Sequence, residues 1–118
     1  MIEQDFPRRG EIWSGFLPAQ PRDPHQPRPV LVISHDRQNR WGNTVIAVPI
    51  FSRGTPDLMH LPIARGVGGL PHDSVLFCDN VSAVDKRLVV EGPYGRPVPD
   101  ALLDQVVLGV RRAIGDVI

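Results

Sequence analysis

Short runs of apolar and β-branched residues, separated by segments rich in glycine, proline and charged residues, make up most of the chain before residue 95. Such runs are typical of strands, and their brevity favours a mainly β fold. The clearest example is Val-Leu-Val-Ile-Ser at 30–34, a continuous apolar run that indicates a buried strand. Strands are predicted at 11–17, 30–34, 44–50, 58–63, 74–77, 79–84 and 88–94.

Three of the intervening segments are predicted to be irregular. Proline recurs every third residue from Pro18 to Pro27, which predicts a stiff, extended loop of polyproline character at the rim of a barrel. Residues 36–42 are too few and too polar for a core helix and predict a turn or a single 3₁₀ turn. The glycines in 66–71 lack the lysine of a P-loop and the spacing of a dinucleotide-binding motif, so they predict a turn.

One helix is predicted, near the C-terminal end. Apolar residues between Leu102 and Ile114 recur at spacings of three and four, which gives a helix over 101–114 a single buried face. Pro99 suits a first helical position, and Asp100 is favourable near the positive end of the helix dipole. The pattern therefore predicts one α+β domain spanning 1–118, in which an amphipathic helix covers a small β-barrel.

Composition limits the class of protein. A chain of 118 residues buries enough surface on folding to form one core without crosslinks. Its single cysteine, Cys78, rules out an internal disulfide and fits a reducing environment. No apolar run approaches the roughly 20 residues of a membrane span, and 1–10 lack the hydrophobic core of a signal peptide. We therefore expect a cytoplasmic protein that does not enter a membrane.

Arginine supplies nearly all of the positive charge. Lys plus Arg and Asp plus Glu number 13 each, so net charge gives no reason to expect nucleic-acid binding, yet Lys86 is the only lysine. Arginine is suited to bidentate phosphate contacts and to stacking on bases. A genome rich in GC, which favours arginine codons, is the alternative explanation.

Metal and hydrolase motifs are weakly represented. The four histidines stand singly with no pair at ligand spacing, so we expect no metal site. The chain has no Gly-x-Ser-x-Gly nucleophile elbow and no nucleotide-binding motif, so we expect no cofactor. The polar residues that remain as a candidate site are Asp23, His25, Arg28, Ser52, Arg53, Asp79 and Asn80.

Arg28 is the most informative of these residues. Proline disfavours helical geometry in the residue before it, so Pro29 directs Arg28 toward an extended conformation where the buried strand begins. The arginine is therefore fixed by its neighbours at the mouth of the predicted barrel.

Several short segments, taken in order and spacing, resemble the MazF/PemK-like endoribonuclease toxins of bacterial type II toxin–antitoxin systems. The resemblance covers nearly the whole chain and rests on 9–13, 28–34, 39–40, 45–50, 69–75, 84–88 and the closing amphipathic helix. It implies an SH3-like β-barrel, a homodimer, and metal-independent cleavage of single-stranded mRNA at short sequences. It also implies a small, acidic cognate antitoxin whose flexible tail covers the RNA groove.

In these enzymes the 2′-hydroxyl of the RNA attacks the adjacent phosphate, leaving a 2′,3′-cyclic phosphate and a 5′-hydroxyl. This reaction needs a base, an acid and a cation for the developing charge. The resemblance implies that Arg28 is the catalytic arginine, which holds the phosphate and donates a proton. Asp23, where many relatives have glutamate, and His25 are alternative bases, and the sequence leaves the choice open.

One position departs from the family pattern. Relatives commonly end the third strand with a threonine whose hydroxyl contacts the scissile phosphate, and Phe51 stands in its place. Ser52 follows, but side chains alternate faces along a strand, so its hydroxyl points away unless the strand bends. Three outcomes are open: Ser52 is re-aimed and catalytic, Phe51 stacks on a base while another donor serves the phosphate, or activity is weak.

RNA recognition is expected to rest on stacking and base-edge contacts. Trp41, with Asn39 and Arg40, forms a candidate platform, and packing in a dimer interface is the alternative for the tryptophan. The segment 79–80 resembles a Cys-Asp-Gln segment that some relatives use near RNA. The predicted RNA-binding residues are Asn39, Arg40, Trp41, Phe51, Arg53, Asp79 and Asn80.

Two other functions stay open. The first is a catalytically silent toxin of the same barrel that acts by binding protein, as the gyrase-inhibiting relatives do. Those relatives depend on a tryptophan at the end of the C-terminal helix, and 112–118 contains none. The second is a degenerate RNA-binding module, which Phe51 alone suggests.

Overall fold

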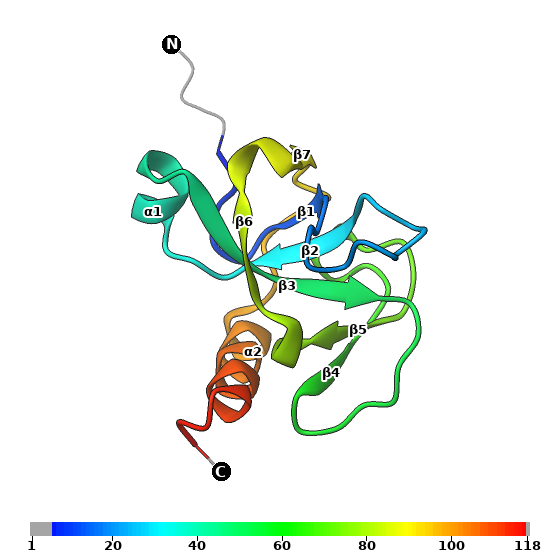
Figure 1. The fold of residues 1–118 in the computed structure, drawn as a ribbon. Coiled ribbons are helices and arrows are strands. Elements are labelled where there is room, and N and C mark those ends of the chain that lie inside the picture. The colour runs from blue at the N-terminus through cyan, green and yellow to red at the C-terminus, as the bar shows by residue number, and fades with distance from the viewer. Residues whose placement is uncertain (1–5, 118) are drawn as a thin grey trace.

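Residues 6–117 are described by the computed structural model, in which they form seven strands and a long C-terminal helix (Figure 1). The strands are β1 (Ile12–Gly15), β2 (Arg28–Val32), β3 (Thr44–Phe51), β4 (His60–Ile63), β5 (Ser74–Phe77), β6 (Ser82–Asp85) and β7 (Val89–Glu91). The α-helices are α1 (Asp36–Trp41) and α2 (Asp100–Ala113), and three short 3₁₀ helices lie at Val67–Gly69, Cys78–Asn80 and Lys86–Leu88. Residues 1–5, which the signal-peptide prediction partly concerns, and residue 118 lie outside the described residues.

Every strand pairing is antiparallel, and β3 is the centre of the sheet. The order is β4-β5-β3-β2-β1-β7, and β6 also pairs with β3. One edge of β3 pairs with β2, whereas its other edge is shared by β6, along 44–47, and β5, at 50–51. Because two strands share one edge, the sheet bends around β3 into a small barrel. This confirms the predicted mainly β barrel with a C-terminal helix.

Strand β2 is buried on both faces, which explains its unbroken apolar sequence. Leu31 packs in one cluster of buried side chains, with residues of β1, β3, β5 and α2. Val30 and Val32 point to the other face and pack in a second cluster with residues of β3 and β6. Arg28, at the start of this strand, is therefore anchored to a strand that is buried on both faces.

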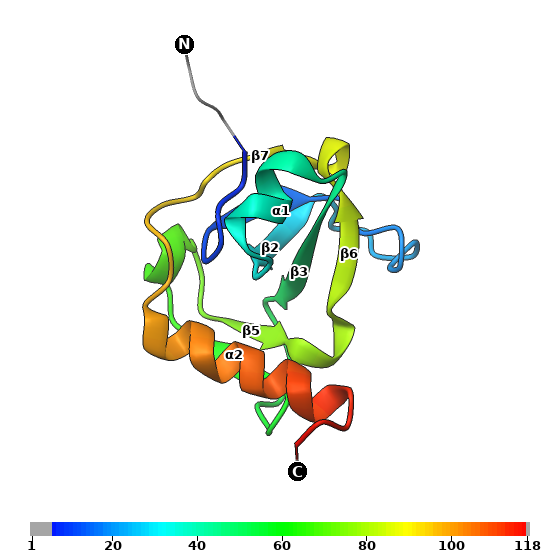
Figure 2. The same ribbon diagram turned by 90° about the vertical axis from the view of Figure 1, so that its left-hand side faces the viewer.

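Helix α2 closes the barrel, as Figure 2 shows by its course past β5. Leu103 and Val106 enter the first cluster. Gly109 lies against Cys78, and a Cβ at that glycine would stand 2.8 Å from the cysteine Sγ. Burial raises the pKa of the Cys78 thiol to about 11, so this side chain is protonated and packs as an apolar group.

Segment 36–42 contradicts the prediction of a turn, because it contains the α-helix α1. His35 caps the helix: its Nδ1 accepts a hydrogen bond from the backbone N–H of Gln38 at 3.2 Å. Asn39 is fully buried, and its Nδ2 donates to the Ser34 carbonyl oxygen at 2.8 Å. These bonds stabilise a helix that composition alone does not favour.

The proline-rich loop also differs from its prediction. Residues 18–27 form a series of tight turns instead of an extended polyproline segment. The backbone N–H groups of Gln20 and Asp23 donate to the carbonyl oxygens of Leu17 and Gln20 at 2.9 and 3.1 Å. Such internal bonds are absent from polyproline helices, so the loop is folded back on itself.

Candidate functional site

The side chain of Gln26 holds the ends of the β1–β2 loop together. Its Oε1 accepts a hydrogen bond from the backbone N–H of Leu17. Its Nε2 donates to the carbonyl oxygens of Leu17 and Gln20, at 3.2 and 2.6 Å. The folded loop places Asp23 directly against Arg28, which begins β2.

Asp23 and Arg28 form a two-bonded ion pair. The Nε of Arg28 donates to Oδ2 of Asp23, and its Nη2 donates to Oδ1 at 2.7 Å. Only 10% of the arginine side chain and 7% of the aspartate side chain are exposed. The hydrogen bond from Arg28 lowers the pKa of Asp23 below its usual value of 3.8, so the carboxylate is charged at neutral pH.

Two further groups confine the Arg28 guanidinium. Its Nη1 donates to the carbonyl oxygen of Ile50 at 3.2 Å, and its Cζ lies 4.2 Å from the centroid of the Phe51 ring. A guanidinium has five N–H groups, of which three are used by Asp23 and Ile50. Among residues 6–117 the other two, one on each Nη, have no hydrogen-bond partner, so they are available to an anion.

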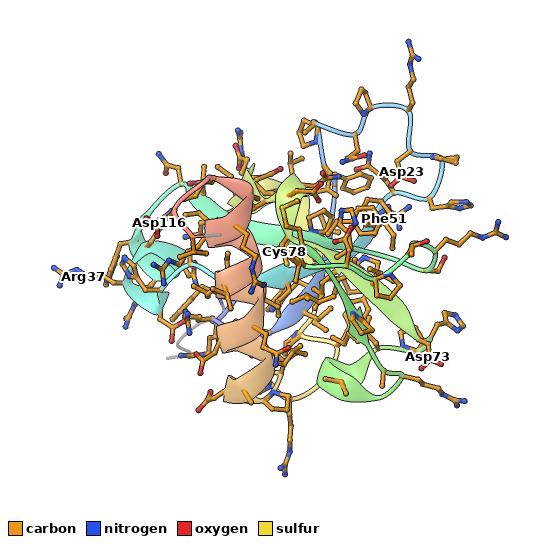
Figure 3. The ribbon with its side chains drawn as sticks, turned by 90° about the horizontal axis from the view of Figure 1, so that it is seen from below. Asp23, Arg37, Phe51, Asp73, Cys78 and Asp116 are labelled. Carbon is orange, nitrogen blue, oxygen red and sulfur yellow. The ribbon has the colours of Figure 1, made fainter. Side chains whose placement is uncertain are left out.

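Two hollows meet at Phe51. One, of about 470 Å³, is lined by Ala19, Gln20, Pro21, Arg22, Asp23, Arg28 and Phe51. The other, of about 600 Å³, is lined by His25, Arg28, Phe51, Ser52, Arg53 and Phe77. Figure 3 shows Asp23 and Phe51 near one another, and both line the first hollow. Arg28 borders both hollows, so an anion can reach it from either.

The part of the chain that contains the Arg28 site matches a known protein family. The family described as the PemK-like, MazF-like toxin of type II toxin–antitoxin systems matches residues 8–114. The chain belongs to this family. The finding confirms the resemblance that the sequence carries.

Several solved structures share the fold of this chain. MazF of Deinococcus radiodurans is 21% identical, with a TM-score of 0.78, and the match covers 95% of this chain and 99% of that one. An endoribonuclease from a mycobacterial species in complex with its cognate antitoxin is 20% identical, with a TM-score of 0.72, covering 92% and 95%. The Mycobacterium tuberculosis toxin MazF-mt6 is 19% identical, with a TM-score of 0.68, covering 89% and 96%. At these identities the likeness shows a shared fold.

In this MazF-like toxin the structure gathers six of the predicted site residues around the two hollows. They are Asp23, His25, Arg28, Phe51, Ser52 and Arg53. The backbone N–H of His25 donates to Oδ1 of Asp23 at 2.9 Å, and its exposed side chain lines the larger hollow. Ser52 and Arg53 are also exposed there.

The predicted platform on α1 lies elsewhere. Strand β3 runs from beside α1 to Phe51, and its eight residues span roughly 23 Å (Figure 1). Asn39 is fully buried and bonded to Ser34, so its prediction as a reader of bases is wrong. Trp41 is 73% exposed, and the Arg40 guanidinium lies 4.6 Å from its ring. These two residues therefore form a surface separate from the Arg28 site.

The segment 79–80 does not line either hollow, and Asp79 is connected to the larger one only through His60 and Phe77. Asp79 Oδ1 lies 2.8 Å from Nε2 of His60, which the sequence did not suggest as a functional residue. The His60 ring stacks on Phe77, which lines the larger hollow. The Ser82 hydroxyl donates a hydrogen bond to the backbone carbonyl oxygen of Asn80 at 3.0 Å, which is a local structural contact. Only the register of the sheet brings His60 and Phe77 beside the site, and no sequence motif marks them.

The described residues contain neither a cluster of metal ligands nor a membrane-spanning helix. No group of three or more histidine, cysteine, aspartate or glutamate side chains in 6–117 is placed to hold a metal ion. No helix of that part of the chain combines the length and apolar character needed to cross a membrane.

Proposed function

We propose that this MazF-like toxin is an endoribonuclease that cuts single-stranded RNA at short sequences without a metal. The observation that carries the proposal is the arrangement of Arg28, which is nearly buried and ion-paired but keeps two N–H donors beside two hollows. Guanidinium donors in fixed positions suit the oxygens of a phosphodiester whose negative charge grows in the transition state. The mycobacterial relatives, which are named as endoribonucleases, support the same activity.

In the proposed reaction the 2′-oxygen of the RNA bonds to the adjacent phosphorus, and the bond from phosphorus to the 5′-oxygen breaks. Arg28 binds the non-bridging oxygens and stabilises the charge that develops on them. Arg28 is not the proton donor that the resemblance implies, because an arginine guanidinium stays protonated in proteins. The leaving 5′-oxygen takes its proton from water, and the hydroxide that remains is neutralised by the proton that the base took from the 2′-hydroxyl. The products are a 2′,3′-cyclic phosphate and a 5′-hydroxyl.

The geometry supports a choice between the two candidate bases. The Arg28 hydrogen bonds that lower the pKa of Asp23 also make this carboxylate a weaker base, and both of its oxygens already accept bonds from the arginine. His25 lines the larger hollow with an exposed side chain. We therefore assign the 2′-hydroxyl proton to the His25 imidazole and a positioning role to Asp23.

The toxin is expected to act with two kinds of protein partner. Solved relatives include MazE–MazF complexes and an endoribonuclease bound to its cognate antitoxin. We propose that this chain likewise has a small, acidic antitoxin, forms a homodimer and acts on mRNA in the cytoplasm. A toxin that acts only by binding protein is not favoured, because such a toxin has no need of the charged, two-sided Arg28 site.

The test of the activity is incubation of the purified protein with a long single-stranded RNA in EDTA, beside a DNA of the same sequence. We expect RNA fragments with 5′-hydroxyl and 2′,3′-cyclic phosphate ends and intact DNA, since DNA lacks the attacking 2′-hydroxyl. Sequencing of the fragment ends gives the recognised site. Cleavage of both nucleic acids, or 5′-phosphate ends, would reject the mechanism, and intact RNA in every condition would reject the activity.

The assignment of the base predicts losses of different size in two variants. His25→Ala is expected to lower the cleavage rate roughly 10²-fold or more, because it removes the group that takes the 2′-hydroxyl proton. Asp23→Asn is expected to lower the rate by a smaller factor, because Asp23 acts only by holding Arg28 in place. Single-turnover rates of the two variants at one pH measure both effects.

His72→Ala is the matched control for the histidine variant, because His72 is exposed on the β4–β5 connection and does not line either hollow. A larger loss of rate in Asp23→Asn than in His25→Ala would reverse the assignment.

A further inference from the structure

Strand register places the Phe51 ring on the Arg28 guanidinium. Val30 pairs with Pro49 across β2 and β3, so Arg28 and Phe51 stand opposite one another at the ends of these two strands. The guanidinium Cζ lies 4.2 Å from the ring centroid, within the range of a cation–π contact. Asp23 and Ile50 bind the edges of the same group. The ring therefore supplies a restraint that these hydrogen bonds do not, because it limits tilting of the guanidinium plane.

The Phe51 ring is itself held by a row of aromatic side chains on three neighbouring strands. It meets Phe77 edge to face, with 4.7 Å between ring centroids and 61° between planes. Phe77 stacks on His60, with 4.3 Å between centroids and 28° between planes. Phe51 pairs with Val75 and His60 pairs with Phe77, so the three rings, which we call the aromatic row, share one face of the sheet.

Backbone and carboxylates fix the far end of the aromatic row. A Cβ on Gly54 would lie 2.8 Å from Cε1 of Phe77, so the backbone there lies directly against the ring. His60 Nε2 lies 2.8 Å from Asp79 Oδ1, and its Nδ1 lies 3.3 Å from Asp57 Oδ2. The backbone N–H groups of Met59 and His60 donate to Asp57 at 2.8 Å each. Because both imidazole nitrogens face carboxylates, the His60 ring has one preferred orientation.

We propose that Phe51 is a positioning residue for Arg28 and that Phe77 and His60 keep its ring in place. The inference rests on the proposed RNA cleavage and deepens it, because it gives a role to the side chain that stands where related toxins have threonine. The aromatic row aligns the two unpaired N–H groups of Arg28 with the phosphate. Its contribution is to the rate of the chemical step, since it acts on the orientation of the group that stabilises the transition state.

The kinetic test compares Phe51→Leu, which keeps apolar bulk but has no ring, with Phe51→Tyr, which keeps the ring. We expect Phe51→Leu to lower kcat roughly 5- to 30-fold with little change in KM, and Phe51→Tyr to stay close to the parent protein. Phe77→Leu and His60→Ala are expected to lower kcat by successively smaller factors.

The matched controls remove similar groups away from the aromatic row. Phe6→Leu takes a ring from Arg8, whose Cζ lies 4.5 Å from its centroid, and His72→Ala removes an exposed imidazole. Both are expected to cleave RNA at the parent rate. A Phe51→Leu variant with unchanged kcat, or one whose KM alone rises, would overturn the proposal, since the second result shows a ring that stacks on a base.

A second measurement does not depend on activity. Protons near the face of an aromatic ring experience its ring current, so the Nε–H resonance of Arg28 in a ¹H–¹⁵N NMR spectrum reports the position of the Phe51 ring. We expect this resonance to move in Phe51→Leu, to stay in Phe51→Tyr, and to move by smaller amounts in Phe77→Leu and His60→Ala. The same resonance in parent protein and Phe51→Leu would overturn the positioning role.

The two measurements separate this inference from the proposed activity. A parent protein that leaves RNA intact rejects the nuclease, and with it any positioning role in cleavage, even if the resonance moves as expected. A parent protein that cleaves RNA while Phe51→Leu retains full kcat rejects the positioning role alone.

Discussion

Arg28→Ala is expected to reduce RNA cleavage on the order of 10²- to 10³-fold, the usual effect of removing a donor that stabilises transition-state charge. Arg28→Lys is expected to recover little of this loss. An ammonium group keeps the charge, but it cannot bind Asp23 through two bonds and hold the Ile50 carbonyl while presenting two further donors in the same plane. Single-turnover rates on one short RNA containing the mapped site measure both variants.

Loss of Arg28 also leaves a carboxylate without its partner, and this requires a control. The Asp23 side chain is only 7% exposed, so an unpaired charge there destabilises the folded protein. The double variant Arg28→Ala, Asp23→Asn removes that charge and is expected to recover stability while staying inactive. If the double variant regained cleavage, the effect of Arg28→Ala would be one of folding, and Arg28 would not be catalytic.

Gly69→Ala is expected to destabilise the folded protein severely, by on the order of 4 kcal/mol in the free energy of unfolding. Its φ of +87° disfavours any side chain, and a Cβ would lie 2.5 Å from the carbonyl carbon and oxygen of Tyr94. Backbone atoms cannot turn aside as a flexible side chain can, so the two segments must separate. Urea unfolding followed by far-UV circular dichroism measures the loss.

Gly66 provides a matched control for this prediction. Its φ is +91°, close to that of Gly69, but a Cβ there would meet nothing within 4 Å. Gly66→Ala is therefore expected to lose only about 1–2 kcal/mol, from backbone strain alone. Equal losses in the two variants would mean that the contact with Tyr94 contributes nothing.

Features set by local pattern were predicted well from the sequence. The run at 30–34 indicated a buried strand, and β2 occupies 28–32, because a strand covered on both faces must be apolar at every position. The helix predicted at 101–114 is α2, Asp100–Ala113, since its apolar spacing is visible without any knowledge of its partner. Arg28 was recognisable as a fixed residue from Pro29 alone.

Features that depend on side-chain partners were predicted poorly. Helix α1 exists because His35 caps it and Asn39 bonds to Ser34, and neither partnership leaves a periodic pattern. Gln26 folds the proline-rich loop through three bonds that composition does not reveal. The aromatic row depends on the register in which β4, β5 and β3 pair. This register cannot be predicted from the sequence of any one strand.

The site is assembled from parts of the chain that are synthesised at different times. Arg28 lies on β2 and Phe51 on β3, but the cluster that supports both strands also needs Leu103 and Val106 of α2. A ribosome that has translated only as far as residue 95 has therefore produced every proposed catalytic side chain without the helix that closes their core. A message broken before the codons of α2 consequently encodes a fragment that carries these side chains but lacks the helix that closes their core.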